Sequence, residues 1–409
     1  MEETHNDEFY NFLMEDDSDD EDQQRVKLLI FLAAISNDYT SRKTYYVRDR
    51  IEWDAHVAKL NFESPKAFLQ MYRMDLASFN KLCSWLDPFL RVNPVMSHVH
   101  TGKGAIVIEV VVHCLLRWLA GGSHLDIQLM AGISVPSFFT CIHKCVHAVL
   151  QCNQLAIKFP RSVDEIEQSA KSFRNFSTDG VIDGCVACLD GMLLPIQTPS
   201  STETGNVMAY YSGHYAEYGL NIQAACDSMC RFVYVSVAAP GSTSDIVALR
   251  KTSLSRLIEA LPLGKYVLGD NAYVCTEHLL TPFPGDQRRQ PQNDTYNYHL
   301  SQLRIRIEMT FGRFMNQWRL FKRPLQVNLK NAGKVYMCAA RLFNFCANER
   351  LIGSADANTM AGDITFEHYI SSDTTERVEG NSMMRDILVN KIYHSGLSRP
   401  SENRQRNRG

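Results

Sequence analysis

The stretch that decides the fold is VACLDGMLLPI, residues Val186–Ile196. Apolar residues flank Asp190 on both sides, which predicts a strand buried inside a sheet. A carboxylate in such a place is costly unless it is paired or binds a metal. The sequence therefore predicts a buried strand whose only acid has a chemical role.

The segments that follow alternate between strand-like and helix-like patterns. The expected strands are Asn221–Cys226, Phe232–Ala238 and Tyr266–Leu268, and the expected helices are Asp245–Glu259, Glu277–Leu280, Tyr298–Trp318 and Ala332–Asn348. Strands that come first and are then surrounded by helices are typical of an α/β domain. We expect this domain to span residues 155–350.

A helical region precedes it, over residues 60–152. A short helix at His124–Met130, a turn at Gly132–Ser134 and a longer helix at Pro136–Leu150 follow the spacing of a helix-turn-helix. On the second helix, only His143, Lys144 and His147 are polar or basic side chains that could extend to DNA bases. A helix that reads bases normally carries more such groups. Two interpretations stay open: a packing or dimerisation module, which is favoured, and a DNA reader.

Three carboxylates stand out by position. Asp190 lies within its strand, and Asp270 directly follows the strand-like run Tyr266–Gly269. The carboxyl ends of strands are where α/β sheets place ligands. Glu308 lies at the edge of the apolar stripe of the helix Tyr298–Trp318, where its carboxylate can face a strand end. An ion pair with Arg304, one turn earlier, is the alternative for Glu308 taken alone.

Together these acids fit a site for two divalent ions. Hard oxygen ligands select Mg²⁺ or Mn²⁺, and two such ions can activate water and stabilise the leaving oxygen of a phosphodiester. Asp190 would bridge both ions, while Asp270 and Glu308 would each complete one. We find no Gly-x-Ser-x-Gly elbow and no phosphate-cradling glycine loop, which disfavours an unrelated α/β hydrolase.

Five ordered motifs resemble those of the Harbinger (PIF/IS5-like) DDE transposases. They are Leu189–Met192, Pro240–Asp245, Gly269–Tyr273 with Leu279–Phe283 behind it, Arg306–Arg313 and Arg341–Cys346. The resemblance implies a ribonuclease-H-like, metal-dependent DNA endonuclease with Asp190, Asp270 and Glu308 as its catalytic acids. The alternative is a domesticated, non-catalytic DNA- or chromatin-binding descendant.

The same resemblance draws attention to residues around the acids. Asp245 matches an additional family acid, for which a supporting or structural role is favoured over a place in the metal site. Met192, Asn271 and Phe343 depart from the residues that the family prefers. Because all three catalytic acids are present, the sequence favours a catalytically competent enzyme over an inactive descendant.

Basic residues gather on the glutamate helix and just after it. They are Arg304, Arg306, Arg313, Arg319, Lys322 and Arg323. A solvated face is one interpretation, and a DNA phosphate track beside the cut site is the other. The resemblance further implies a Myb-like DNA-binding protein as a partner. Assembly of the chain into a homo-oligomer is a further expectation.

The two ends of the chain differ in charge. Residues 1–24 hold eleven acids and no Lys or Arg, so the remaining 34 acids face all 42 basic residues and the body of the chain is basic. We expect 1–24 to be an acidic disordered tail and 351–409 a largely disordered C-terminal extension. No signal peptide or membrane span is expected, and twelve scattered cysteines suit reduced thiols. A nuclear location, with a cytoplasmic one as the alternative, follows as an expectation.

Overall fold

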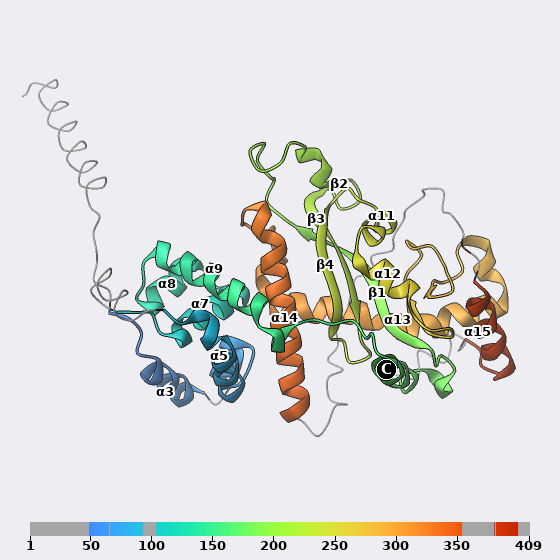
Figure 1. The fold of residues 1–409 in the computed structure, drawn as a ribbon, viewed down its shortest axis with the longest axis horizontal. Coiled ribbons are helices and arrows are strands. Elements are labelled where there is room, and N and C mark those ends of the chain that lie inside the picture. The colour runs from blue at the N-terminus through green and yellow to red at the C-terminus, as the bar shows by residue number, and fades with distance from the viewer. Residues whose placement is uncertain (1–48, 65, 93–103, 354–379, 381, 400–409) are drawn as a thin grey trace, which may run out of the picture. The chain divides into compact units, whose positions relative to one another are not determined.

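A computed structural model describes residues 49–64, 66–92, 104–353, 380 and 382–399. The chain from Arg50 onward forms one compact unit (Figure 1). The acidic tail expected over residues 1–24 lies outside the described residues, and so does most of the expected C-terminal extension. Within that extension the structure describes one helix, α15 (Met383–His394).

A mixed sheet forms the centre of the domain. Its strands are β1 (Cys185–Pro195), β2 (Tyr211–Ser212), β3 (Glu217–Cys226), β4 (Phe232–Pro240), β5 (Tyr266–Leu268) and β6 (Leu279–Leu280). β3 lies between β1 and β4 and is antiparallel to both, whereas β5 is parallel to β1 and to β6. The four predicted strands are present as β1, β3, β4 and β5, and the α/β class is confirmed.

The two faces of the sheet pack against different helices. Cys188 belongs to the core on the side of α13 (Pro291–Gln317), where its Sγ donates to the carbonyl oxygen of Leu303 at 3.3 Å. Its neighbour Leu189 belongs to a second core with α10 (Val163–Arg174) and α12 (Ser253–Glu259). Since side chains alternate along a strand, Asp190 shares the α13 face with Cys188.

One predicted helix is wrong. Glu277–Leu280 was expected to be helical, but Leu279 and Leu280 form β6, which pairs in parallel with Val267 and Leu268 of β5. A four-residue pattern cannot distinguish a short helix from a short strand, and here the exposed backbone edge of β5 decides the outcome.

Other helix boundaries also shift. The helix expected over Asp245–Glu259 is divided into α11 (Asp245–Arg250) and α12, because Thr252 caps the start of α12 by accepting from the backbone N–H of Leu254. α13 begins at Pro291 rather than at Tyr298, and α14 spans Leu329–Gly353.

Helices also fill the region before the sheet. They are α3 (Trp53–Glu63), α4 (Ala67–Tyr72), α5 (Leu76–Leu90), α7 (Ile108–Leu119), α8 (His124–Ala131) and α9 (Val135–Gln151). Their buried side chains belong to the same hydrophobic core as those of α13 and α14. α9 packs on α14, so these helices and the sheet share one interior (Figure 1).

The arrangement of α8 and α9 matches the predicted helix-turn-helix spacing. α8 and α9 meet at an angle of 97°, and Gly132 between them has a φ of 63°, which favours glycine. This angle falls within the roughly 90–120° of helix-turn-helix motifs. Among the described residues no single helix is long and apolar enough to span a membrane, and only this bent pair has the length and composition when its two helices are taken together.

Candidate active site

Asp190 lies within β1, and Asp270 follows the end of the neighbouring strand β5. Cys188 of β1 pairs with Leu268 of β5, and each aspartate comes two residues later. Adjacent strands are about 4.8 Å apart, so Asp190 and Asp270 lie side by side. The backbone N–H of Gly191 donates to Oδ1 of Asp190 at 2.8 Å, and that of Ala272 donates to Oδ1 of Asp270 at 2.9 Å.

Helix α13 brings the third acid to the same face. Glu308 forms an ion pair with Arg304 one turn earlier, and the Arg304 guanidinium lies 3.8 Å from Oδ2 of Asp190. One guanidinium therefore faces two carboxylates that are 118 positions apart in sequence. The structure brings Asp190, Asp270 and Glu308 to one region and places Arg304 among them.

The charges in this region shift each other's protonation. Burial and then the charge of Asp270 raise the pKa of Asp190 well above its usual value, against the opposing effects of Arg304 and the Gly191 N–H. Burial disfavours the charge of Arg304, but Glu308, Asp190 and Asp270 together raise its pKa. Three carboxylates and one arginine thus form a single electrostatic cluster.

The donor set of the cluster fits a hard divalent cation. All three acids offer carboxylate oxygens, and Oδ2 of Asp190 faces Arg304 at 3.8 Å, too far for a hydrogen bond. Within the described ranges, no three His, Cys, Asp or Glu side chains are placed to hold an ion as they stand. The carboxylates fit Mg²⁺ or Mn²⁺ if the Arg304 side chain turns away.

Asp245 contacts the other face of the sheet. Its Oδ1 accepts from Asn221 Nδ2 at 2.9 Å and from Gln223 Nε2 at 2.8 Å, while Gln223 Oε1 accepts from the buried hydroxyl of Tyr273 at 2.8 Å. Tyr273 and Leu189 belong to the core opposite α13. This chain of hydrogen bonds joins the segment after Asp270 to β3 and to the start of α11, so the supporting role expected of Asp245 has a structural counterpart.

Gly191 makes this arrangement fit. A Cβ atom at Gly191 would lie 2.2 Å from Oδ1 of Asp245 and 3.0 Å from Nε2 of Gln223. Only glycine leaves room for the Asp245 carboxylate against β1. Motif spacing alone gave no indication of the contacts made by Gln223 and Tyr273, because their partners lie 22 and 50 positions away from Gln223 in sequence.

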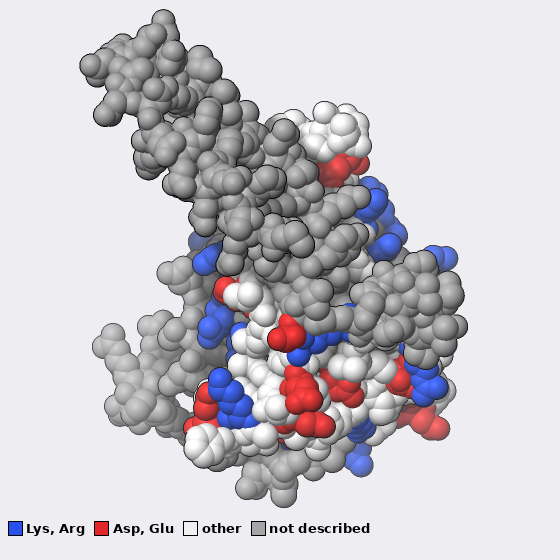
Figure 2. Space-filling view, turned by 90° about the vertical axis from the view of Figure 1, so that its left-hand side faces the viewer, with Lys and Arg blue, Asp and Glu red and all other residues white. Residues whose placement is uncertain are grey.

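The predicted basic residues do not all face the same way. Arg304 faces the acids, and the Arg306 guanidinium lies 4.0 Å from the centre of the Phe176 ring. Arg319, Lys322 and Arg323 are exposed, and Lys322 Nζ donates to Asn316 Oδ1. On the face shown in Figure 2, the coloured Lys and Arg side chains are interspersed with Asp and Glu. The exposed members of this basic set are thus mainly the residues that follow Gln317.

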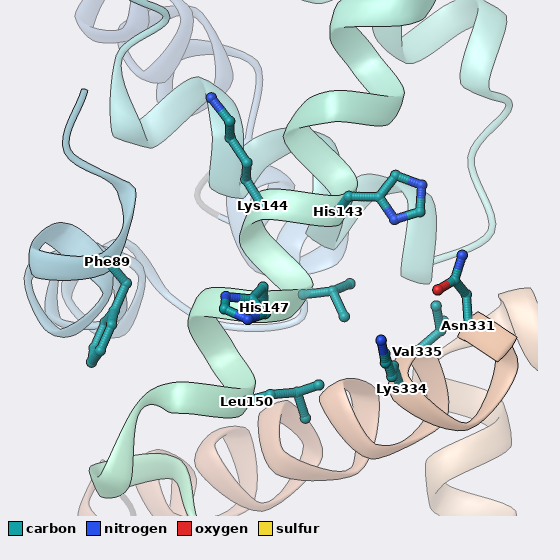
Figure 3. Close-up of a pocket in the computed structure, with 9 residues that line it drawn as sticks. Phe89, His143, Lys144, His147, Leu150, Asn331, Lys334 and Val335 are labelled. Carbon is teal, nitrogen blue, oxygen red and sulfur yellow. The ribbon is translucent and has the colours of Figure 1, made fainter. Parts of the chain in front are cut away.

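The polar groups of α9 line a groove against α14. His143 and His147 of α9 approach Asn331 and Lys334 of α14 over an apolar floor that includes Val335 (Figure 3). Lys144 also lines the groove, which has a volume of about 390 Å³. The packing of α9 on α14 agrees with the favoured interpretation of this helix as a packing element.

A mixed sheet that brings two aspartates and a helix-borne glutamate together on one face defines an α/β domain with a candidate carboxylate site. Residues 189–344 match the family model described as DDE superfamily endonuclease. Over these residues the chain is similar to DDE superfamily endonucleases, a domain that fits the ribonuclease-H-like fold, and the resemblance drawn from the motifs is confirmed.

The chain is also similar in sequence to individual curated proteins. The chain is 22% identical over 284 residues to "Protein ALP1-like" of Arabidopsis thaliana, covering 66% of this chain and 68% of the relative. It is 26% identical over 217 residues to "Putative nuclease HARBI1" of Bos taurus, and 24% identical over 217 residues to the Homo sapiens protein of that name. Each of these two alignments covers 52% of this chain and 59% of the relative. No solved structure matches the chain.

Asp190→Asn should stabilise the protein when no divalent ion is present. Because the folded-state pKa of Asp190 is raised, the stability linked to this carboxyl is present below its unfolded pKa and is lost as the pH rises through the folded value. We expect the melting temperature of the wild type, without divalent ions, to fall over that rise while the variant changes less. Thermal denaturation in EDTA across the pH range measures this. An equal pH dependence in both proteins would contradict it.

Proposed function

We propose that this chain is a DNA endonuclease that uses divalent metal ions, with Asp190, Asp270 and Glu308 as its catalytic acids. The observation that carries the proposal is the sharing of Arg304 by Asp190 and Glu308 beside the end of β5. The match to DDE superfamily endonucleases supports the reaction class. DNA as the substrate, and Mg²⁺ or Mn²⁺ as the ion, are parts of this proposal.

Each of these side chains has a distinct role in the proposed reaction. Asp190 and Asp270, on adjacent strands, would hold metal ions from the sheet, and Glu308 would complete the site from α13. When bound, such ions activate water and stabilise the oxygen that leaves the phosphodiester. Arg304 would keep the acids together until an ion takes its place, and would then be available to a phosphate oxygen.

A supercoiled-plasmid nicking assay in Mg²⁺ tests the proposal. The wild type should convert supercoiled to open-circular DNA, and Asp190→Ala should not. Asp286→Ala is a matched control, because it removes an acid whose side chain is 87% exposed and which belongs to none of the groups above. Equal nicking by wild type and Asp190→Ala would reject the proposed site.

Arg304→Gln should strengthen the binding of Mn²⁺ in the absence of DNA. A divalent ion then no longer has to displace a guanidinium from the carboxylates, and a partly exposed ion pair contributes about 1 kcal/mol, or roughly fivefold in affinity. Isothermal titration with Mn²⁺ measures the change, and Arg289→Gln removes an exposed ion pair elsewhere as a control. Weaker Mn²⁺ binding by Arg304→Gln would mean that Arg304 supports the metal site and does not compete for it.

A non-catalytic DNA-binding protein is the second candidate function. The observation that favours it is the same Arg304, since an arginine held among three acids can also be a permanent structural ion pair. Under this alternative Mn²⁺ would not bind, and DNA binding would persist without cleavage. A nuclear location, a Myb-like partner and a homo-oligomer belong to the proposal through the family resemblance.

A further inference from the structure

Four arginines from separate elements meet where α13 ends. Arg73 follows α4, Arg117 lies in the last turn of α7, Arg319 follows α13, and Arg350 lies near the end of α14. Arg73 Nε donates to the carbonyl oxygen of Gln317 at 3.3 Å, and Arg350 Nη2 donates to the carbonyl oxygen of Arg73 at 3.2 Å. We call these four residues the arginine cluster.

The loop after α7 closes the cluster. A Cβ atom at Gly121, whose φ is 97°, would lie 2.9 Å from Cβ of Arg319. Glycine therefore allows the end of α7 to pack directly on Arg319, which brings Arg117, one turn before Gly121, toward the exit of α13. Residues as far apart in sequence as Arg73 and Arg350 are gathered by the fold and not by local spacing.

Three of the four arginines have no acidic partner among the described residues. In the part of the chain that the structure describes, Arg73, Arg117 and Arg319 form no ion pair, and Nε of Arg117 is buried without a hydrogen-bond partner. Burial and then the charges of Arg319, Arg117 and Arg350 lower the pKa of Arg73. Like charges held together in this way are destabilising unless an anion joins them.

We propose that the arginine cluster binds a phosphate of the DNA backbone, as a contact separate from the three acids. Guanidinium groups suit this role, because their planar donors match phosphate oxygens and keep their charge. The inference rests on the proposed DNA endonuclease function and adds a positioning contact to it. Arg319 was expected to contact phosphate from sequence, whereas Arg73 and Arg117 were not.

Helix α13 sets the distance between the cluster and the acids. Glu308 and Gln317, the last residue of α13, are nine residues apart, which corresponds to roughly 13.5 Å along a helix at 1.5 Å per residue, and Arg319 follows two residues later. Successive phosphates of one DNA strand advance about 3.4 Å along the duplex axis. A duplex with one phosphate at the acids can thus place another, about four nucleotides away, near the end of α13, where the cluster lies.

The experiment compares DNA binding by two charge-matched double variants in an Asp190→Asn chain. Arg73→Gln with Arg319→Gln removes two cluster charges, and Arg250→Gln with Arg256→Gln removes two from the exposed sides of α11 and α12. Fluorescence anisotropy over a range of KCl concentrations gives the slope of log K against log[KCl]. The cluster variant should have a shallower slope by about 0.9 for the lost phosphate contact, and the control should keep the parent slope.

Thermal denaturation separates binding from folding. Because the cluster repels itself, the cluster variant should melt no lower than the parent in the absence of DNA, and Arg319→Gln alone, at an exposed position, provides a milder version. An unchanged slope in folded variants overturns the proposal. Stabilisation of the wild type by inorganic phosphate, together with an unchanged DNA slope, would also overturn it and indicate a site for a free anion.

The outcome also separates this inference from the endonuclease proposal. A shallower slope with no plasmid nicking by the wild type would retain the phosphate contact and reject the nuclease. Nicking that depends on Asp190, with equal slopes for both double variants, would retain the nuclease and reject the phosphate contact.

Discussion

Asp270→Asn lowers Mg²⁺-dependent nicking by about a hundredfold to a thousandfold and leaves the fold intact. The reason is electrostatic: an amide removes the negative charge that a divalent ion requires, and the loss of one preorganised charge contact at a reacting centre costs on the order of 10²–10³ in rate. Asp270 lies beside Asp190 at the end of β5, so no other described carboxylate in that position replaces it. Single-turnover nicking rates measure the effect.

Two controls show whether a loss of activity in Asp270→Asn comes from the lost charge and not from misfolding. Circular dichroism and melting temperature should match the wild type, since Asn retains an oxygen that can accept from the N–H of Ala272. Asp294→Asn is a suitable control, because it alters an acid that pairs with Arg399 away from the three carboxylates. A rate for Asp270→Asn within tenfold of wild type would remove Asp270 from the catalytic set.

Gly191→Ala has the second large effect, on stability and activity together. The added methyl group would lie 2.2 Å from Oδ1 and 2.7 Å from Cγ of Asp245, so the start of α11 or the strand β1 must move. Overpacking of this kind costs about 2 kcal/mol in unfolding free energy. Because Asp190 is the preceding residue, the movement also displaces a catalytic acid. Urea denaturation and the nicking assay measure the two parts.

Two further substitutions serve as controls for Gly191→Ala. Gly213→Ala introduces a methyl group at a position where nothing lies within 4 Å, and it should have little effect. Shortening the obstructing side chain, in Gly191→Ala with Asp245→Ser, should recover part of the lost stability. If Gly191→Ala is as stable and active as Gly213→Ala, the close approach of Asp245 to β1 is wrong.

Much of the fold followed from local pattern. The strand around Asp190 and the strand before Asp270 are short apolar runs bounded by turns, and the stripe of α13 has a clear helical period. The split of the expected Asp245–Glu259 helix and the identity of β6 did not follow. Both depend on tertiary partners, namely the Thr252 cap and the open edge of β5.

The site was only half visible in the sequence. Asp190, Asp270 and Glu308 could be chosen because each interrupts or borders an apolar pattern. Arg304 was recognised as a neighbour of Glu308, but its approach to Asp190 depends on how α13 crosses the sheet. The contact of Gln223 with Tyr273 joins residues 50 positions apart, and that of Arg350 with Arg73 joins residues 277 positions apart, which no spacing rule within one segment can reveal.

The most direct test of the metal site is anomalous X-ray diffraction from crystals grown with Mn²⁺. The account predicts anomalous density among the carboxylates of Asp190, Asp270 and Glu308, with the Arg304 guanidinium turned away from them. Crystals of Asp190→Asn grown in the same way should show this density weakened or lost. Saturating Mn²⁺ that leaves Arg304 paired with Glu308 and gives no density between the three acids would contradict the account.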